Sequence, residues 1–320
     1  MKQAGKKAGM NQPLTERRNP VSADLDRKSS LEIARIINRE DAKVARAVRA
    51  ALPQIAKAMD LITTALKRRG RVIYVGAGTS GRIAALDAAE CPPTFNTDPK
   101  TVQFVIAGGS RALAAAVESN EDSRALGKRE LAKRNPGSHD VVIGIAASGR
   151  TPFTVAAVEY ARRRGAKTVA VTCNRNSPLA HSAHLAIVTE VGPEVIAGSS
   201  RMKAGTAQKM VLNMLSSGAM ARLGYVYGNL MVNLHGNNQK LAQRAITILE
   251  RGAGIDRVAA RRLLKSAGNS VPAALIMKKA EVGRSDALRA LQAANGNVRQ
   301  AIAQARRAES IEPPRLEARG

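Results

Sequence analysis

Apolar residues recur at spacings of three and four through residues 30–69 and predict helical structure there. Gly70 follows the last periodic position, as is typical of a helix C-terminus. The periodic positions are Leu31, Ile33, Ile36, Ile37, Val48, Leu52, Ile55, Met59, Ile62 and Leu66.

Beyond Gly70 the pattern alternates between short β-type runs and helical stretches. Strands are predicted at residues 71–75, 102–106, 140–145, 168–172 and near 185–189. The first strand is followed by a helix to Glu90, which we expect Pro92 and Pro93 to close. Further helices are predicted up to about residue 134 and over 152–164. This alternation is typical of a parallel sheet covered by helices, an α/β fold.

The last third of the chain changes character. Residues 205–222 form a strongly apolar helical pattern, and beyond residue 252 only short helices are indicated. We therefore expect an N-terminal arm (1–29), a main α/β domain (30–251), a small helical bundle (252–308) and a frayed tail (309–320).

Composition excludes several classes of protein. With 44% hydrophobic residues in 320, the chain can bury a sizeable core and does not have the composition of a disordered or fibrous protein. The longest nearly uncharged apolar stretch, residues 210–221, is shorter than the roughly 18 to 20 residues that a membrane span needs. Only two cysteines occur, far apart, which argues against a disulfide framework or a zinc site and fits a reducing cytoplasm.

The net charge of +26 raises the question of nucleic-acid binding. The charge is spread along the chain, and seven aromatic residues cannot supply many base-stacking platforms. We expect no nucleic-acid partner and no membrane partner, and take the basic surface to serve solubility or the steering of a small anionic substrate.

Two turns carry the strongest local signal for chemistry. Residues 78–82 (Gly-Thr-Ser-Gly-Arg) and 147–151 (Ala-Ser-Gly-Arg-Thr) each follow a strand and open a helix. Such turns present backbone N–H groups, small hydroxyls and the positive end of a helix dipole, which together suit an anion. Ordinary helix caps are the alternative, and the repetition of Ser-Gly-Arg in equivalent positions disfavours it. Candidate contacts to the phosphate or other anion are Gly78, Thr79, Ser80, Ser148, Gly149 and Thr151.

Residues 76–81 also match the dinucleotide-binding pattern G-x-G-x-x-G. A dinucleotide site needs an acidic residue near the end of the second strand, but residues 107–110 read Ala-Gly-Gly-Ser. We therefore expect no nucleotide cofactor. The four histidines show no metal-binding spacing, and no metal is expected.

A third string, residues 192–209, gathers small residues, hydroxyls and cations at the start of the apolar helix. This string, the two turns, Asp87-Ala88-Ala89-Glu90-Cys91-Pro92-Pro93-Thr94 and Glu121-Asp122-Ser123 closely resemble the N-acetylmuramic acid 6-phosphate (MurNAc 6-phosphate) etherase family. The resemblance runs from about residue 14 to residue 302. It implies a SIS-type (sugar isomerase) three-layer sandwich whose parallel sheet is flanked by helices, followed by a small, UBA-like C-terminal helical bundle.

The same resemblance implies an activity and its residues. The family cleaves the D-lactyl ether of MurNAc 6-phosphate by elimination and water addition, giving N-acetylglucosamine (GlcNAc) 6-phosphate and D-lactate in peptidoglycan amino-sugar recycling, without a cofactor. Family matching indicates Glu90 and Glu121 as catalytic. Glu90 should end a helix, where the negative dipole end favours a protonated acid, and Glu121 should follow helix caps at Ser119 and Asn120, which favour an ionised base. Glu118 and Asp122 compete with Glu121 for the second role.

The sequence leaves two alternative functions open. The glucokinase regulatory protein belongs to the same fold family and binds phosphorylated sugars without etherase chemistry, and an aldose–ketose isomerase would release no lactate. SIS relatives also suggest a homodimer whose pockets form between subunits. Lys203, Lys209 and Arg201 are weaker candidates for anion contacts, and Glu194 is expected to line the pocket. One departure from the family pattern is Asn233, where the family usually has aspartate.

Overall fold

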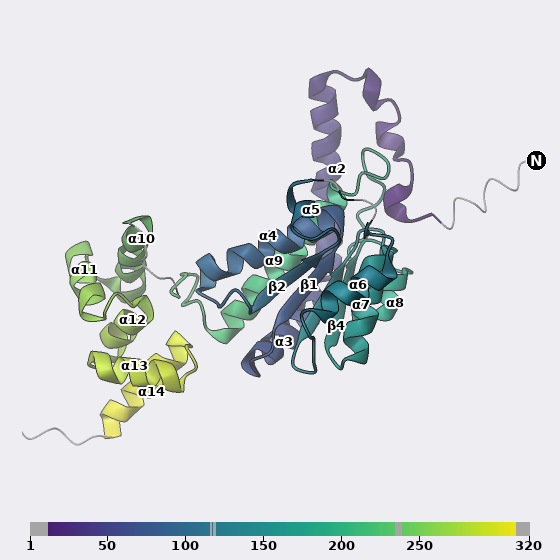
Figure 1. Ribbon diagram of the computed structural model, residues 1–320. Coiled ribbons are helices and arrows are strands. Elements are labelled where there is room, and N and C mark those ends of the chain that lie inside the picture. The colour runs from purple at the N-terminus through teal and green to yellow at the C-terminus, as the bar shows by residue number, and fades with distance from the viewer. Residues whose placement is uncertain (1–11, 116, 118–119, 234–238, 312–320) are drawn as a thin grey trace, which may run out of the picture. The chain divides into compact units, whose positions relative to one another are not determined.

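The computed structural model describes residues 12–115, 117, 120–233 and 239–311. The chain forms two compact units, one from residues 1–90 and 98–219 and the other from residues 91–97 and 220–320. Figure 1 shows a sheet with its helices in the first unit and helices alone in the second. None of the helices in the described ranges is both long and apolar enough to cross a membrane.

The first unit is built on a five-stranded parallel sheet in the order β2-β1-β3-β4-β5. All five strands occur where the sequence predicts them. Every residue of the two strands β1 and β3 is buried, because helices cover both faces of the sheet. The strands are β1 (Val72–Gly76), β2 (Val102–Ile106), β3 (Val141–Ile145), β4 (Lys167–Thr172) and β5 (Leu185–Val188).

One face of the sheet packs against α6 (Arg124–Ala132), α7 (Pro152–Arg163) and α8 (Pro178–Ser182). Alternate strand residues such as Ile73, Val75 and Val142 join Leu131 of α6 and Phe153 of α7 in one buried cluster.

The opposite face meets α4 (Gly78–Phe95) and α9 (Lys203–Leu223). The hydroxyl of Tyr74 on β1 donates to Asp87 of α4 (2.8 Å), which also accepts from Asn213 and Ser216 of α9. The sheet therefore lies between two helical layers, and the three-layer fold implied by the resemblance is confirmed.

Two long helices precede the sheet. α2 (Ser30–Ala50) begins with a capping box between Ser29 and Glu32. α3 (Leu52–Lys67) follows after a single break at Ala51. The buried face of α2 consists of Ile36, Glu40, Val44 and Val48, at spacings of four.

Residues 12–29 form three short 3₁₀ turns: η1 (Leu14–Glu16), η2 (Pro20–Ser22) and η3 (Leu25–Arg27). This segment lies against the loops that follow β4 and β5. The backbone N–H of Leu14 donates to the Asn174 side chain (2.7 Å), and the Ser22 hydroxyl donates to the Val195 carbonyl (2.7 Å).

Two helices differ from the prediction. α4 does not end at Glu90 but continues through Pro92 and Pro93 to Phe95. The carbonyl of Phe95 accepts from the Asn233 side chain (2.9 Å), and Cys91 and Phe95 are buried, so packing offsets the two lost N–H donors. The predicted helix up to residue 134 is instead divided into α5 (Arg111–Ala114) and α6.

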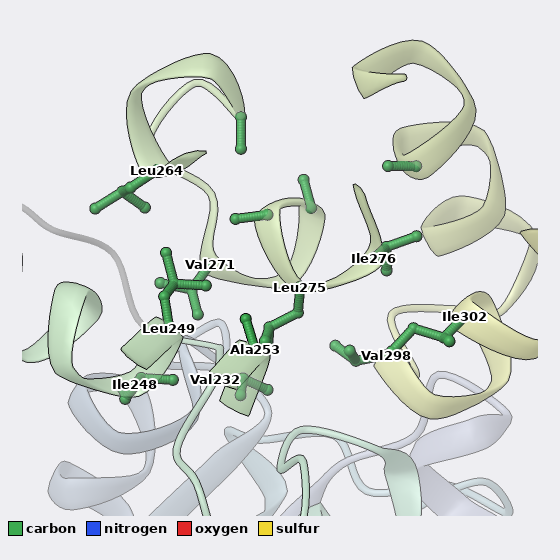
Figure 2. Close-up of a cluster of buried hydrophobic side chains, with 14 of the residues drawn as sticks. Val232, Ile248, Leu249, Ala253, Leu264, Val271, Leu275, Ile276, Val298 and Ile302 are labelled. Atoms are coloured by element: carbon green, nitrogen blue, oxygen red, sulfur yellow. The ribbon is translucent and has the colours of Figure 1, made fainter. Parts of the chain in front are cut away.

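The second unit is helical, as the sequence predicts beyond residue 252. Figure 2 shows its core, in which Leu249, Val271, Leu275 and Ile276 are fully buried together with Val232. α10 lies in a segment where the sequence analysis predicts no helix. The elements are α10 (Gln239–Leu249), a π-helical turn η5 (Glu250–Gly254), α11 (Arg257–Ser266), α12 (Val271–Ala280), α13 (Arg284–Ala293) and α14 (Val298–Ile311).

Candidate functional site

The strand order places a topological switch point between β1 and β3, where a ligand crevice is expected in an open α/β sheet. We refer to this place, at the carboxyl ends of the two strands, as the crevice. The helix after β1 crosses to β2 on one face of the sheet, and the helix after β3 crosses to β4 on the other face. At such a switch point the two strand–helix turns diverge and leave room for a ligand at the carboxyl ends of the strands. Gly76 and Ile145 are register partners, so the two turns that the sequence singled out lie side by side.

The first turn is very short. Only Ala77 separates β1 from α4, and Gly78 has a positive φ of 50°. A Cβ at Gly81 would lie 2.5 Å from the Ile106 side chain, so glycine lets the helix start close to the sheet. Within the described residues, neither the Thr79 nor the Ser80 hydroxyl has a hydrogen-bond partner, so both are available to a ligand together with the N–H groups of the first helical turn.

The second turn is equally constrained. Gly149 has a φ of 67°, and a Cβ there would lie 2.3 Å from the Ser177 hydroxyl. The Ser148 hydroxyl accepts from the N–H of Arg150 (3.2 Å). Thr151 is the N-cap residue of α7, but its side chain makes no capping hydrogen bond. A hydroxyl at the start of a helix that does not cap the helix can contact an anion.

Glu121 lies next to this second turn. Its backbone carbonyl accepts from the N–H of Phe153 in the first turn of α7 (3.0 Å), and its side chain is half-buried. The expected helix caps are wrong for Asn120, because Ser123 caps α6 by accepting from the N–H of Leu126 (3.2 Å). Glu121 thus lies two residues before the cap, and Ser119 and Glu118 fall outside the described residues.

Glu90 lies away from the crevice of its own chain. It is exposed on α4, twelve residues after Gly78, which corresponds to about 18 Å along the helix axis. Since α4 continues to Phe95, Glu90 lies inside the helix and does not end it, contrary to the prediction. The structure therefore brings Gly78, Thr79 and Ser80 together with the residues of the second turn and Glu121, and places Glu90 elsewhere.

The third string forms the start of α9 next to the first turn. Thr79 lies close to Gly205, whose added Cβ would be 3.5 Å from the Thr79 methyl group. The Glu194 carboxylate caps α9 by accepting from the N–H groups of Lys203 and Ala204 (both 2.9 Å). Burial raises the pKa of Glu194, while these hydrogen bonds lower it less strongly. Glu194 is therefore fully buried and caps α9, and its place in the lining of a substrate pocket stays a prediction.

Lys203 forms a buried ion pair that was not predicted from the sequence. Its ammonium group lies 2.6 Å from Glu40, and the two side chains are 1% and 2% exposed. Glu40 also accepts from Asn19 and Lys43, which joins residues 12–29 and α2 to the start of α9. The sequence does contain one indication of this pair. Glu40 lies in the apolar stripe of α2, and a buried charge requires a partner.

The described residues contain no group of three or more His, Cys, Asp or Glu side chains placed to hold a metal ion. His184 bonds through Nδ1 to Thr168, and His181 lies 2.9 Å from the Ser177 carbonyl. Both rings therefore have local structural partners.

Comparison with known proteins identifies related domains and related full-length chains. The model of the glucokinase regulatory protein N-terminal SIS domain matches residues 54–162, and the SIS domain model matches residues 130–217. An N-acetylmuramic acid 6-phosphate etherase from Vibrio vulnificus (strain YJ016) is 49% identical over 296 residues, covering 92% of this chain and 99% of the relative. The etherase from Symbiobacterium thermophilum is 56% identical over 268 residues, covering 83% and 89%.

Among solved structures, a phosphoheptose isomerase from Francisella tularensis matches with a TM-score of 0.49 and 19% identity, covering 61% of this chain and all of that one.

The parallel sheet, its switch point between β1 and β3 and the two matching models define an SIS-domain protein. Within that class the relatives identify one family, because their sequence identity with this chain extends over most of the length of both chains. The chain belongs to the N-acetylmuramic acid 6-phosphate etherase family. It is accordingly an enzyme of the lyase type, and the alternative of a non-catalytic regulator is not favoured, since the regulator's model matches only part of the chain.

Proposed function

We propose that this chain converts MurNAc 6-phosphate and water to GlcNAc 6-phosphate and D-lactate by eliminating the lactyl group and adding water at C3. The observation that carries the proposal is the crevice at the β1/β3 switch point, which combines two anion-binding turns with a carboxylate, Glu121, at its edge.

The phosphate binds at the two turns in this proposal. The first turn offers N–H groups and the hydroxyls of Thr79 and Ser80, and the second offers those of Ser148 and Thr151. A phosphate monoester needs several donors at short range, and a helix N-terminus supplies them together with a favourable dipole. Gly78 and Gly149 allow the backbone to approach the ligand because both adopt a positive φ.

Glu121 is assigned as the base. In the ring-opened sugar, C2 lies next to the C1 aldehyde, so the C2 proton is acidic and a carboxylate can remove it. The electron pair left at C2 then expels the lactyl oxygen from C3 and forms the C2–C3 double bond. Glu90 is assigned as the acid that protonates this oxygen, and it then takes a proton from the water that adds at C3. Glu121 returns its proton to C2, which restores the saturated sugar and both glutamates.

Both glutamates can act on one sugar if the enzyme is a homodimer whose site is shared between subunits. Along α4, Glu90 lies about 18 Å from the turn of its own chain, which is longer than a hexose phosphate. We infer that Glu90 of one subunit serves the crevice of the other. The two cysteines are free and buried, and we place the reaction in the reducing cytoplasm.

Two single variants and their mixture test the assignment. Glu90→Gln and Glu121→Gln should each retain binding of GlcNAc 6-phosphate and lose at least about 100-fold in turnover. If the two residues act across subunits, unfolding and refolding the variants together gives mixed dimers that contain one intact site. Activity should then return to about a quarter of that of the parent protein.

Two results would count against these roles. Either variant retaining near-full turnover with normal folding would remove that glutamate from the mechanism. A mixture with no recovered activity, although mixed dimers form, would place both glutamates of a site in one subunit.

A further inference from the structure

A cavity lies beside Glu90. It measures about 220 Å³ and lies between α4 and α9 of the first unit. Ile83, Leu86 and Leu212 form an apolar wall, and Leu86 is 52% exposed. The polar lining residues are Asp87, Glu90, Lys209 and Asn213. The cavity thus combines an apolar wall, a carboxyl group and one cation.

Lys209 is the cation that lines this cavity. Its side chain is exposed, and across the described residues it forms neither a hydrogen bond nor an ion pair. Asp87 attracts it electrostatically. However, Asp87 is 5% exposed, and its two oxygens already accept from Tyr74, Asn213 and Ser216.

This arrangement differs from that of Lys203, the other lysine considered near the start of α9. Lys203 is buried in an ion pair with Glu40, so its charge is already compensated within the protein. Lys209 lies six residues further along the same helix and faces a cavity instead. A cation in this position is available for an anionic group that enters the cavity with the substrate.

The lactyl group matches the cavity in three respects. It carries a carboxylate, a methyl group and the ether oxygen, all attached to one carbon atom. An acid that protonates the ether oxygen must therefore lie within a few ångströms of whatever binds the carboxylate and the methyl group. Glu90, Lys209 and the wall of Ile83 and Leu86 line one cavity and meet this requirement.

We propose that Lys209 binds the carboxylate of the lactyl group while Ile83 and Leu86 contact its methyl group. This inference rests on the proposed function, and it adds the feature by which the enzyme distinguishes a lactyl ether from a plain amino-sugar phosphate. Lys209 is a substrate-binding residue in this account, and Glu90 remains the proton donor.

The test compares two substrates that differ only in charge: MurNAc 6-phosphate and its lactyl carboxamide. Each is assayed with the parent protein, Lys209→Met and Lys209→Arg. Removing a charge-assisted hydrogen bond should lower kcat/KM for the acid about 10- to 100-fold in Lys209→Met and leave the value for the amide nearly unchanged. Lys209→Arg should keep the preference for the acid.

Lys57→Met is the matched control, because Lys57 is also an exposed lysine on a helix of the first unit but does not line this cavity. It should leave both kcat/KM values unchanged. Binding of GlcNAc 6-phosphate, which has no lactyl group, should be the same in all four proteins. If Lys209→Met prefers the acid over the amide as strongly as the parent protein does, the assignment of Lys209 is wrong.

A binding measurement separates failure of this site from failure of the proposed function. The measured quantity is the affinity for MurNAc 6-phosphate relative to that for GlcNAc 6-phosphate. If the parent protein releases no lactate but binds MurNAc 6-phosphate more tightly, and Lys209→Met loses this preference, the lactyl site is supported and the etherase mechanism is wrong. If lactate is released and Lys209→Met still binds MurNAc 6-phosphate more tightly than GlcNAc 6-phosphate, the etherase mechanism is supported and the lactyl site is wrong. Equal affinity of the parent protein for both sugars would overturn the lactyl site.

Discussion

Breaking the buried ion pair between Glu40 and Lys203 should destabilise the first unit strongly. The two charges lie 2.6 Å apart with side chains 2% and 1% exposed, and they link α2 to the start of α9. Replacing Lys203 with methionine keeps most of the side-chain volume but leaves the Glu40 carboxylate buried, with only Lys43 and Asn19 as partners. An uncompensated buried charge is among the most costly changes in a folded protein.

The size of the effect follows from the pKa of Glu40. Burial alone would raise this pKa, but the hydrogen bonds from Lys203, Lys43 and Asn19 lower it from 4.5 to about 2. At about 1.4 kcal/mol per pKa unit, the ionised form contributes about 3 kcal/mol to the stability of the fold. Because the pKa is lowered on folding, this contribution is complete above pH 4.5 and is lost as the pH falls toward 2.

Urea unfolding at pH 7 measures the prediction. Lys203→Met and Glu40→Gln should each lower the free energy of unfolding by about 3 kcal/mol, and the double variant should cost clearly less than the sum of the two. Lys133→Met is the control, since Lys133 is 63% exposed and pairs with Glu130 at the same 2.6 Å distance. Exposed pairs contribute about 1 kcal/mol or less. If Lys203→Met cost no more than Lys133→Met, the reasoning would be refuted.

Three further predictions concern the crevice and its support. Gly149→Ala should lower the free energy of unfolding in urea by about 2 kcal/mol or more, because the residue has a positive φ and the new Cβ would lie 2.3 Å from Ser177. Gly109→Ala should lower it less, because Gly109 also has a positive φ but no atom lies near the new Cβ. Ser148→Ala should weaken binding of GlcNAc 6-phosphate about 10-fold in calorimetry with an unchanged Tm, and unchanged binding would exclude the hydroxyl as a contact. Asp87→Asn should lower the stability by about 1 to 3 kcal/mol, because an amide has one acceptor oxygen for three donors, and an unaltered Tm would contradict this.

The sheet and the two turns could be predicted from the sequence for a physical reason. Strands buried on both faces are continuous apolar runs, and glycines mark the places where the chain turns sharply into a helix. The crevice follows once strand order is known, but the sequence alone does not contain that order. Placing Gly76 beside Ile145 required the structure.

Other features depended on contacts between distant residues. Pro92 and Pro93 predict the end of a helix, yet α4 continues because Cys91 and Phe95 are buried and Asn233 donates to the Phe95 carbonyl. The partner of Glu40 lies 163 residues away along the chain, so the apolar stripe of α2 could have indicated a buried carboxylate but not Lys203.

The two glutamates illustrate a different limit. Their identity comes from the family resemblance. The predicted positions at helix ends were wrong, because α4 extends past Glu90 and Ser123, not Asn120, caps α6. The position of Glu121 beside α7 depends on the pairing of its carbonyl with Phe153, which no local pattern reveals. The division of roles therefore rests on the crevice and on substrate chemistry.

The most direct test of the central claim is the reaction itself. Purified protein is incubated with MurNAc 6-phosphate in ¹⁸O-labelled water, and both products are examined by mass spectrometry. Cleavage of the bond between C3 and the lactyl oxygen, followed by water addition, predicts unlabelled D-lactate and one ¹⁸O atom at C3 of GlcNAc 6-phosphate, after correction for exchange at C1. Label in the lactate instead, or no lactate from a folded protein that binds the sugar phosphate, would contradict the account.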